Sequence, residues 1–297
     1  INLEDGKIIA GTYGRGIWQS NIPIEIPSND VKLVSIQQPT TGVACSGSVT
    51  PQVEVKNNGL NTISSLVVNY TVDGTLHTYN WSGTIAAGNT QNIVLPTGNF
   101  AKGTHNLSVI TTILGDAYAD NNSSSTVFYV NDAGTVGVVN PFTNTADALV
   151  SYNEGSSGSQ WQRATRNNGN AMDSPTNMVY TTNLSGNYPD MVKSYLVSQC
   201  YNLNNVINPQ ISFSMKYDLE LNWDIVYVEY STDFGANWSV LGTMDTNWYN
   251  SDRTPTTTGD DCNNCLGAQW TGTNTTEATY TYPLNALNAE SNIIFRI

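Results

Sequence analysis

The sequence predicts an all-β protein made of two successive β-sandwiches. In residues 66–72, large apolar side chains recur at every second position, which is the pattern of a strand with one buried face. Residues 211–217 repeat this pattern with four larger side chains. Asp73-Gly74 ends the first run, and this dipeptide is a strong signal for a two-residue hairpin. Because such a sheet face must be covered, we expect stacked sheets.

Composition narrows the class of protein. A chain of 297 residues suggests two domains. Only 12% of the residues are charged, the net charge is −13 and the pI is near 4.3. Lysine and arginine are scattered singly, so we expect no nucleic-acid partner. The chain has no run of about 20 apolar residues, so we expect no direct membrane insertion, and export signals would lie outside this piece.

Residues 1–29 are predicted to be a remnant and a linker. GKIIAGTYGRGIW resembles the closing blade of bacterial β-propellers of the sialidase-like or sortilin-like kind. One blade strand cannot bury its own face, so the resemblance implies a fragment of a larger protein. A phosphate loop at Gly11, Gly14 and Gly16 is not supported, since no helix follows it.

Residues 30–131 are predicted to form an immunoglobulin-like sandwich. They contain seven strand-like runs separated by turn signals, which is typical of that fold. The inward-facing pairs are expected to include Val127 and Tyr129 in the last run. VEVKNNGLNTISSLVVNYTVDG, AKGTHNLSVITT and DNNSSSTVFYV resemble the bacterial adhesion-type, CARDB-like immunoglobulin domains found between catalytic and surface modules.

Residues 132–297 are predicted to form a second sandwich. SYLVSQCYNL, NPQISFSMKY and WDIVYVEYSTDFGANWSVLG occur in the order expected for MAM-like jelly-roll domains, which they resemble. The resemblance implies an extracellular bacterial protein and a sheet that lacks its last strand here. The combination of modules is similar to cargo of the type IX secretion route.

The four cysteines point to structural use. Cys262-Asn-Asn-Cys265 lies in a loop, so a local disulfide is favoured over half a zinc site or a redox pair. With only two histidines in the chain, a partner motif for zinc is missing. Cys45 is the only cysteine of the first sandwich. A buried thiol is favoured for it, pairing with a neighbouring module is the alternative, and the pairing of Cys200 stays open.

Three carboxylates near one turn are a candidate calcium site. Asp218, Glu220 and Asp224 flank Trp223, and oxygen ligands suit Ca²⁺ better than a transition metal. A solvated acidic turn is the favoured interpretation, and a glycosidase pair is not supported because nothing places two carboxylates across a cleft. Apart from Ca²⁺, no cofactor is expected.

Four aromatic residues are candidate ligand contacts. Trp223, Trp248, Tyr249 and Trp270 fall in or beside polar loops, and such flat side chains can stack on sugar rings. Residues 245–276 lack apolar periodicity and are predicted to be a long functional loop. The alternative is that each aromatic anchors its own loop from below.

The pattern Ser231-x-Asp233-x-Gly235-x-x-Trp238 fits the Asp box of sialidase-type propellers. One copy cannot build a propeller, so we expect hairpin architecture. The Asp side chain would cap turn amides, and the tryptophan would pack the turn onto the sheet.

Three functions remain open from the sequence. The first is a non-catalytic, extracellular or cell-surface adhesion or glycan-binding segment, whose partner is a surface glycan or a protein. The second is a structural spacer of an oligomeric appendage, which binds copies of itself. The third is an accessory region of a secreted hydrolase with its catalytic domain elsewhere. HExxH, GxSxG and P-loop motifs are absent from the sequence, so we expect no catalytic site in this segment.

Overall fold

A computed structural model describes the chain except for scattered short segments. The described residues are 7–12, 14, 16–21, 25–39, 42–143, 148–155, 158–165, 178–257 and 262–297. Within these ranges the regular structure is β-strand, with 3₁₀ turns at η1 (Ala119–Asn121) and η2 (Asn285–Leu287) and no α-helix. The all-β prediction is therefore confirmed.

The chain divides into two compact units. The first unit comprises Ile1–Gln37, Gln52–Leu95 and Ser108–Ser125. The second unit comprises Gln38–Pro51, Pro96–Leu107 and Thr126–Ile297. The second unit thus contains three segments of the predicted immunoglobulin-like sandwich as well as everything that follows it.

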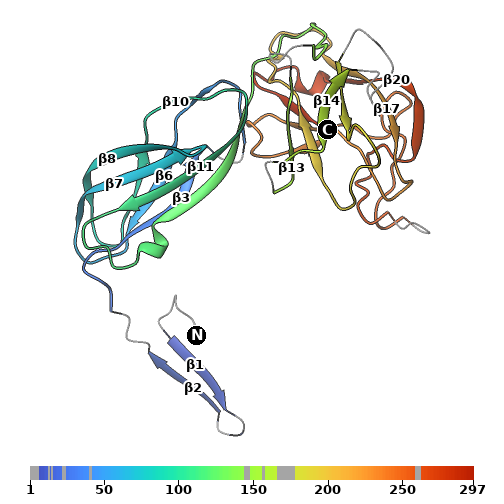
Figure 1. The fold of residues 1–297 in the computed structure, drawn as a ribbon. Helices are drawn as coiled ribbons and strands as arrows, with labels where there is room; N and C mark the ends of the chain where they lie inside the picture. Colours follow the sequence, from blue (N-terminus) through green and yellow to red (C-terminus); the bar gives the residue numbers. More distant parts are fainter. Residues whose placement is uncertain are drawn as a thin grey trace. The chain divides into compact units, whose positions relative to one another are not determined.

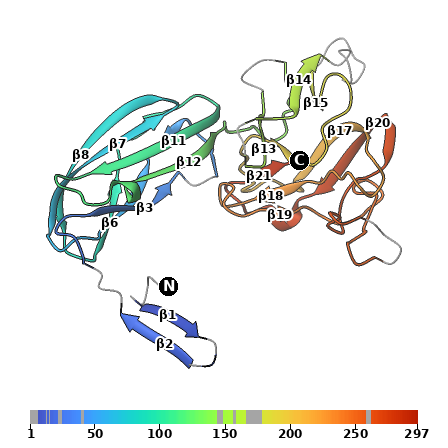
Figure 2. The same cartoon turned by 60° about the horizontal axis from the view of Figure 1, so that its bottom comes forward.

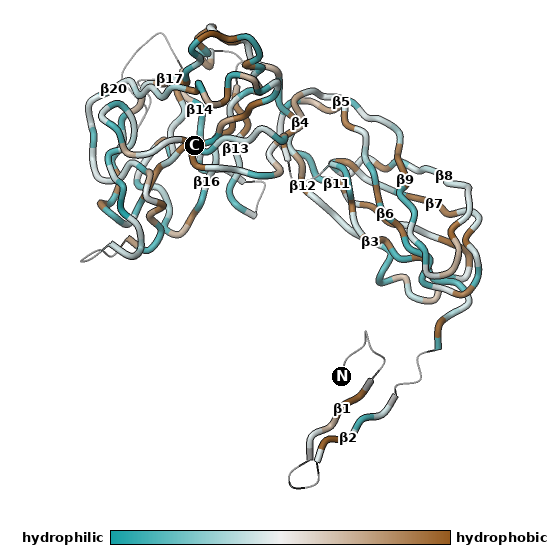
Figure 3. Tube along the Cα trace, turned by 180° about the vertical axis from the view of Figure 1, so that it is seen from behind, coloured by the Kyte–Doolittle hydropathy of each residue, from teal (hydrophilic) through white to brown (hydrophobic). Residues whose placement is uncertain are grey.

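The propeller-like N-terminal motif forms a hairpin. Strands β1 (Lys7–Thr12) and β2 (Gly16–Asn21) pair antiparallel. Ile9, Ile17 and Trp18 are exposed on it, and Figure 3 shows hydrophobic segments along both strands. The sequence prediction of one blade strand is thus replaced by a pair of strands.

The immunoglobulin-like region contains ten strands (Figure 1). These are β3 (Val31–Gln38), β4 (Val43–Ala44), β5 (Ser48–Val49), β6 (Gln52–Asn57), β7 (Ile63–Val72), β8 (Thr75–Ile85), β9 (Thr90–Val94), β10 (Gly98–Asn99), β11 (Gly103–Thr112) and β12 (Ser123–Val130). They form one sheet in the order β3-β6-β9, another in the order β4-β12-β11-β7-β8, and the small pair β10-β5.

Aliphatic alternation builds this sandwich. Leu66, Val68, Tyr70 and Val72 on β7 are all buried, as predicted. The turn between β7 and β8 has positive φ at both Asp73 (49°) and Gly74 (82°), which is the type I′ geometry that the dipeptide predicts. The registers of β7 and β8 are therefore fixed by a local turn and by one buried face.

The end of β12 departs from the prediction. Val127 and Tyr129 were expected to face the immunoglobulin-like core, but both belong to a cluster with Val150, Tyr152 and other residues of the second unit. Phe128 on the opposite face of β12 is buried too. This strand end is covered on both faces, so period 2 alone could not assign its inward side.

Two of the remaining strands have 9 and 11 residues, and the others have 2 to 5 residues (Figure 2). They are β13 (Val150–Asn153), β14 (Trp161–Thr165), β15 (Met178–Thr182), β16 (Ser194–Val197), β17 (Gln210–Asp218), β18 (Glu229–Ser231), β19 (Ser239–Val240), β20 (Thr273–Pro283) and β21 (Ile294–Arg296). The sheets run β13-β16-β21-β18-β19, β14-β15 and β17-β20. Strand β17 is the half-buried antiparallel strand predicted from residues 211–217.

Candidate functional site

The predicted aromatic contact surface lies mostly in the core. Trp248, Tyr249 and Trp270 are 2%, 1% and 0% exposed. The Trp248 indole donates to the Leu241 carbonyl (2.9 Å), and the Trp270 indole donates to the Trp248 carbonyl (2.8 Å). These three side chains cannot stack on a sugar, so their prediction as ligand contacts is wrong, and the alternative of buried loop anchors holds.

The physical reason is that the described residues 245–257 and 262–272 are bound to one another and to residues 226–228. Isolated bridges pair Ser251 with Gln269 inside this irregular segment and pair Trp270 with Val226, which lies just before β18. The Tyr249 hydroxyl accepts from the Val228 amide (2.9 Å) and donates to its carbonyl (3.1 Å). The polar atoms of these three aromatic side chains therefore hydrogen-bond to backbone groups, while their rings pack in the core.

Trp223 differs from the other three aromatics. Its side chain is 54% exposed, on a turn where the Trp223 amide donates to the Glu220 carbonyl (3.2 Å). Asn222 on the same turn has φ of 66° and its amide donates to the Thr271 hydroxyl (2.9 Å). Ligand contact by Trp223 stays a prediction.

Two of the three carboxylates of the acidic turn have separate hydroxyl partners. Asp218 accepts from the Thr273 hydroxyl (2.7 Å), and Asp224 accepts from the Tyr188 hydroxyl (2.6 Å). Burial, followed by this hydrogen bond to Asp224, raises the pKa of Tyr188. The described part of the chain contains no group of three or more His, Cys, Asp or Glu side chains that could hold a metal, so it does not bring Asp218, Glu220 and Asp224 together as a calcium site.

The Asp box forms the predicted hairpin turn. Asp233 accepts from the Ser231 hydroxyl (2.8 Å) and from the Asn237 amide and side chain (2.9 and 2.7 Å). The two bonds from Asn237, followed by the bond from Ser231, hold the pKa of Asp233 below its ordinary value. The Trp238 indole donates to the Gly235 carbonyl (2.9 Å), so the turn is closed at both ends.

Arg296 organises the charged part of the second unit. Its guanidinium lies over the rings of Tyr195 (4.0 Å) and Trp238 (4.1 Å) and pairs with Glu229 (2.6 Å). Burial alone would lower the pKa of Arg296, but the bond and charge of Glu229 raise it. The Arg296 guanidinium also donates to the Tyr152 hydroxyl (3.3 Å). The mostly buried Arg296 guanidinium thus combines an ion pair with two cation–π contacts.

Two disulfides use all four cysteines. Cys262–Cys265 is the local bridge that the sequence predicts, and Cys45–Cys200 joins residues 155 positions apart. The expectation of a buried thiol at Cys45 is therefore wrong, and its alternative holds. Two residues before Cys45, the Val43 amide donates to the Phe234 carbonyl (2.7 Å), so the segment that carries Cys45 is also bound to the Asp-box turn.

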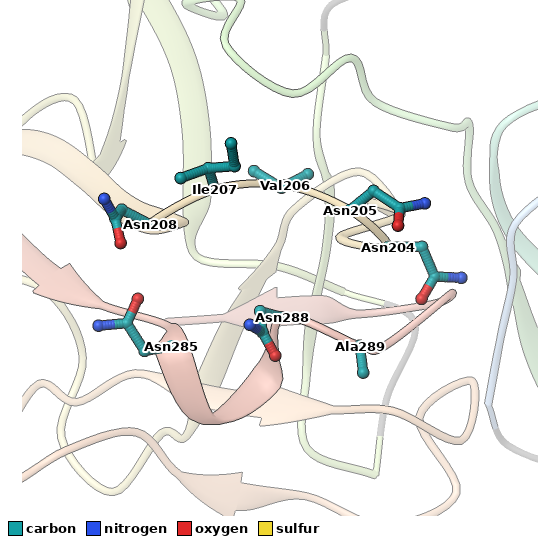
Figure 4. Close-up of a pocket in the computed structure, with 8 residues that line it drawn as sticks. All are labelled: Asn204, Asn205, Val206, Ile207, Asn208, Asn285, Asn288 and Ala289. Carbon is teal, nitrogen blue, oxygen red and sulfur yellow. The ribbon is translucent and has the colours of Figure 1, made fainter.

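The candidate binding site is a groove lined by asparagines. It has a volume of about 580 Å³, and Figure 4 shows residues 204–208 on one side and Asn285, Asn288 and Ala289 on the other. Asn205 and Asn208 have φ of 64° and 50°, a conformation that asparagine tolerates better than most residues. Sequence reasoning missed this groove because asparagine is abundant along the whole chain.

The chemistry of this groove is neutral and polar. Five side-chain amides line it, and no ionisable side chain does. Each amide offers two donors and an acceptor. Ile207 adds an exposed apolar surface between them. The groove can therefore hydrogen-bond an uncharged hydroxyl-rich or amide-rich ligand without proton transfer.

Comparisons with known proteins concern part of the chain only. No protein-family model and no curated protein matches it. The described residues include no helix long and apolar enough to cross a membrane.

The chain is similar over about a third of its length to solved CARDB domains. The solution structure of such a domain from Pyrococcus furiosus is 19% identical, with 36% of this chain and 97% of that one covered and a TM-score of 0.28. The crystal structure of that domain in complex with di-metal ions is also 19% identical, with 36% of this chain and 96% of that one covered and a TM-score of 0.29. A domain assigned to a cell-surface protein of Methanosarcina acetivorans is 18% identical, with 38% of this chain and 100% of that one covered and a TM-score of 0.30. Scores this low carry no argument about ligands.

Proposed function

We propose that the chain is a non-catalytic adhesion segment of an extracellular or cell-surface protein and that it binds a neutral glycan in the asparagine-lined groove. The observation that carries the proposal is the lining of five amides without an ionisable side chain. Sugar hydroxyl groups donate and accept hydrogen bonds as amides do, and the exposed Ile207 offers a surface for the apolar face of a sugar ring.

The disulfides support the extracellular part of this proposal. Bridges such as Cys45–Cys200 persist in oxidising compartments and are rare in the cytosol. With charged residues at 12%, neutral polar side chains supply much of the solubility, which suits an exported β-protein. The propeller end, the MAM-like jelly roll and the type IX secretion route belong to this proposal as its finer parts.

Glycan-array binding of the whole chain, followed by titration of the best glycan, tests the groove. We expect Asn204→Ala/Asn288→Ala to weaken binding at least tenfold, because two amide partners are lost. Asn205 and Asn208 are left unchanged, since alanine would strain their positive φ. Asn80→Ala, an exposed site on β8, is the matched control and should bind as the wild type does.

Two results would contradict the groove as the binding site. One is an array without any bound glycan. The other is binding that survives the double substitution and falls with Trp223→Ala, which would move the site to the exposed tryptophan.

A structural spacer is the second candidate. It is favoured by the cross-linked second unit, in which the long disulfide and the Arg296 cluster hold distant segments together. This function predicts regular self-association without ligand, measured by sedimentation at increasing concentration. An accessory role beside a hydrolase domain requires neither the groove nor self-association, so it would appear as neither glycan binding nor self-association.

A further inference from the structure

A second polar cluster lies in the first unit, at the start of β3. The segments around Asn29, Asn58 and Ala117 meet there through backbone hydrogen bonds. The Asn58 amide donates to the Asp30 carbonyl (2.8 Å), and the Ala117 amide donates to the Asn29 carbonyl (3.1 Å). In Figure 1 this is the end of the sandwich where the short green turn lies beside β3. Three loops are thus fixed around one point.

Asp30 places a fully buried carboxylate in this cluster. Asp30 is 0% exposed. Its two carboxylate oxygens accept from the side-chain nitrogens of Asn121 (3.1 Å) and Asn58 (2.8 Å). Within the described residues, no lysine, arginine or histidine nitrogen lies within 4.0 Å of this carboxylate. A buried carboxylate whose only partners are neutral amides lacks a counter-charge.

Asp116 brings a second carboxylate beside the first. One oxygen accepts from the Val31 amide (3.2 Å) and from the Asn122 side-chain nitrogen (3.2 Å), and the other accepts from the Tyr118 amide (3.0 Å). Val31 directly follows Asp30, so the Asp116 carboxylate is bound to the residue next to Asp30 at the start of β3. Hydrogen bonds thus hold two carboxylates at this end of the sandwich.

Two buried side-chain oxygens of the same cluster are unpaired. The Oδ1 atoms of Asn121 and Asn122 are buried and have no hydrogen-bond partner, and only one other buried side-chain atom of the described residues shares this state. Asn122 is 4% exposed. The Asn122 side-chain nitrogen donates to Asp116, and the Asn121 side-chain nitrogen donates to Asp30. Both side chains therefore belong to the cluster.

We propose that Asp30, Asp116, Asn121 and Asn122 form a binding site for a divalent cation of the calcium type. Two carboxylates and two amide oxygens form an all-oxygen set of mixed charge, which Ca²⁺ accepts with flexible geometry. Mg²⁺ demands a stricter octahedron and gives up its waters reluctantly, so it fits this set less well. The cation supplies the missing counter-charge and lies between the three loops.

Calorimetric titration and thermal melting of the whole chain test this site. We expect saturable binding of one Ca²⁺ and a higher melting temperature in CaCl₂ than in chelator or in MgCl₂ at equal ionic strength. Asp116→Asn and Asn122→Ala should each weaken Ca²⁺ binding at least tenfold. Asn122→Asp should increase the difference in melting temperature between CaCl₂ and chelator, because a third carboxylate repels the other two until the cation binds.

Asp190→Asn is the matched control, since Asp190 is an exposed carboxylate of the second unit. It should leave Ca²⁺ binding unchanged. The proposal is overturned if the wild-type chain shows neither saturable binding nor a shift in melting temperature. It is equally overturned if Asp190→Asn weakens binding as much as Asp116→Asn does, because that result describes a diffuse acidic surface.

Discussion

The two β-sandwiches fill their cores by different means. In the immunoglobulin-like region, strands β6 and β7 place aliphatic side chains such as Val53, Val55 and Val68 inward at every second position. In the C-terminal region, β18, β19 and β21 are two or three residues long and offer few such positions. Buried aromatic rings from outside the regular strands fill the space instead. Regular alternation builds a core only where strands are long enough to repeat it.

The disulfides follow the division into compact units rather than the division into sandwiches. Both disulfides lie in the second unit, where short strands leave less hydrogen-bonded sheet, and all four cysteines are used there. The first unit instead has the polar cluster around Asp30 at the start of β3. Disulfides and aromatic side chains therefore stabilise the second unit. Long strands and hydrogen-bonded asparagine side chains stabilise the first unit.

Removing the long disulfide should have the largest effect, and it should act on the second unit. For Cys45→Ala/Cys200→Ala we expect a loss of about 5 kcal/mol in free energy of unfolding, because the opened loop spans 155 positions. Urea unfolding followed by tryptophan fluorescence measures it. Cys262→Ala/Cys265→Ala is the matched control, and closing its short loop is worth only about 2 kcal/mol. Equal losses in both variants would contradict the chain-entropy explanation.

Truncating one buried ring tests the aromatic core. Trp270→Ala should destabilise the second unit by about 4 kcal/mol, because a fully buried side chain leaves a cavity. Trp223→Ala, at an exposed position, should change the free energy of unfolding by less than about 0.5 kcal/mol. Thermal melting and urea unfolding compare the two. A neutral Trp270→Ala would mean that residues 245–272 do not fill the core.

Arg296→Met tests the charged cluster. We expect a loss of about 3 kcal/mol, because Glu229 would stay buried without its partner. Arg296→Met/Glu229→Gln should recover part of that loss, since the buried charge is then removed as well. If the double variant is no more stable than the single one in urea unfolding, packing over Tyr195 and Trp238 rather than charge pairing accounts for the effect.

The smallest expected effect concerns the pH dependence of the Asp-box turn. The folded pKa of Asp233 lies below the ordinary 3.8, so its hydrogen bonds contribute fully above pH 3.8. The contribution is lost as pH falls below 3.8 through the folded pKa, because the unfolded carboxyl binds its proton first. Asp233→Asn should remove this part of the acid dependence in urea titrations at pH 3 to 5. An unchanged acid dependence would contradict it.

Local patterns carried much of the fold. The alternation in β7 and β17, the Asp73-Gly74 hairpin and the Asp-box turn were all predictable, because each depends on residues close together in sequence. The Cys262–Cys265 bridge was predictable for the same reason.

Long-range features were not predictable to the same degree. The partner of Cys45 lies 155 positions away, and nothing local distinguishes a bridged cysteine from a buried thiol. The burial of Trp248 and Trp270 depends on isolated bridges that leave no period in the sequence. The groove around Asn204 and Asn288 is formed by two separate turns of a residue type that occurs throughout the chain. Tertiary structure decides each of these.

The long bridge between Cys45 and Cys200 also closes just over half of the chain into a ring. Every connection from residue 46 to residue 199 lies inside that ring. A protease that cuts once within it leaves the two halves covalently attached until the bridge is reduced. In a milieu of foreign proteases, a single nick at one loop therefore releases no fragment, and the molecule keeps both of its ends on one piece.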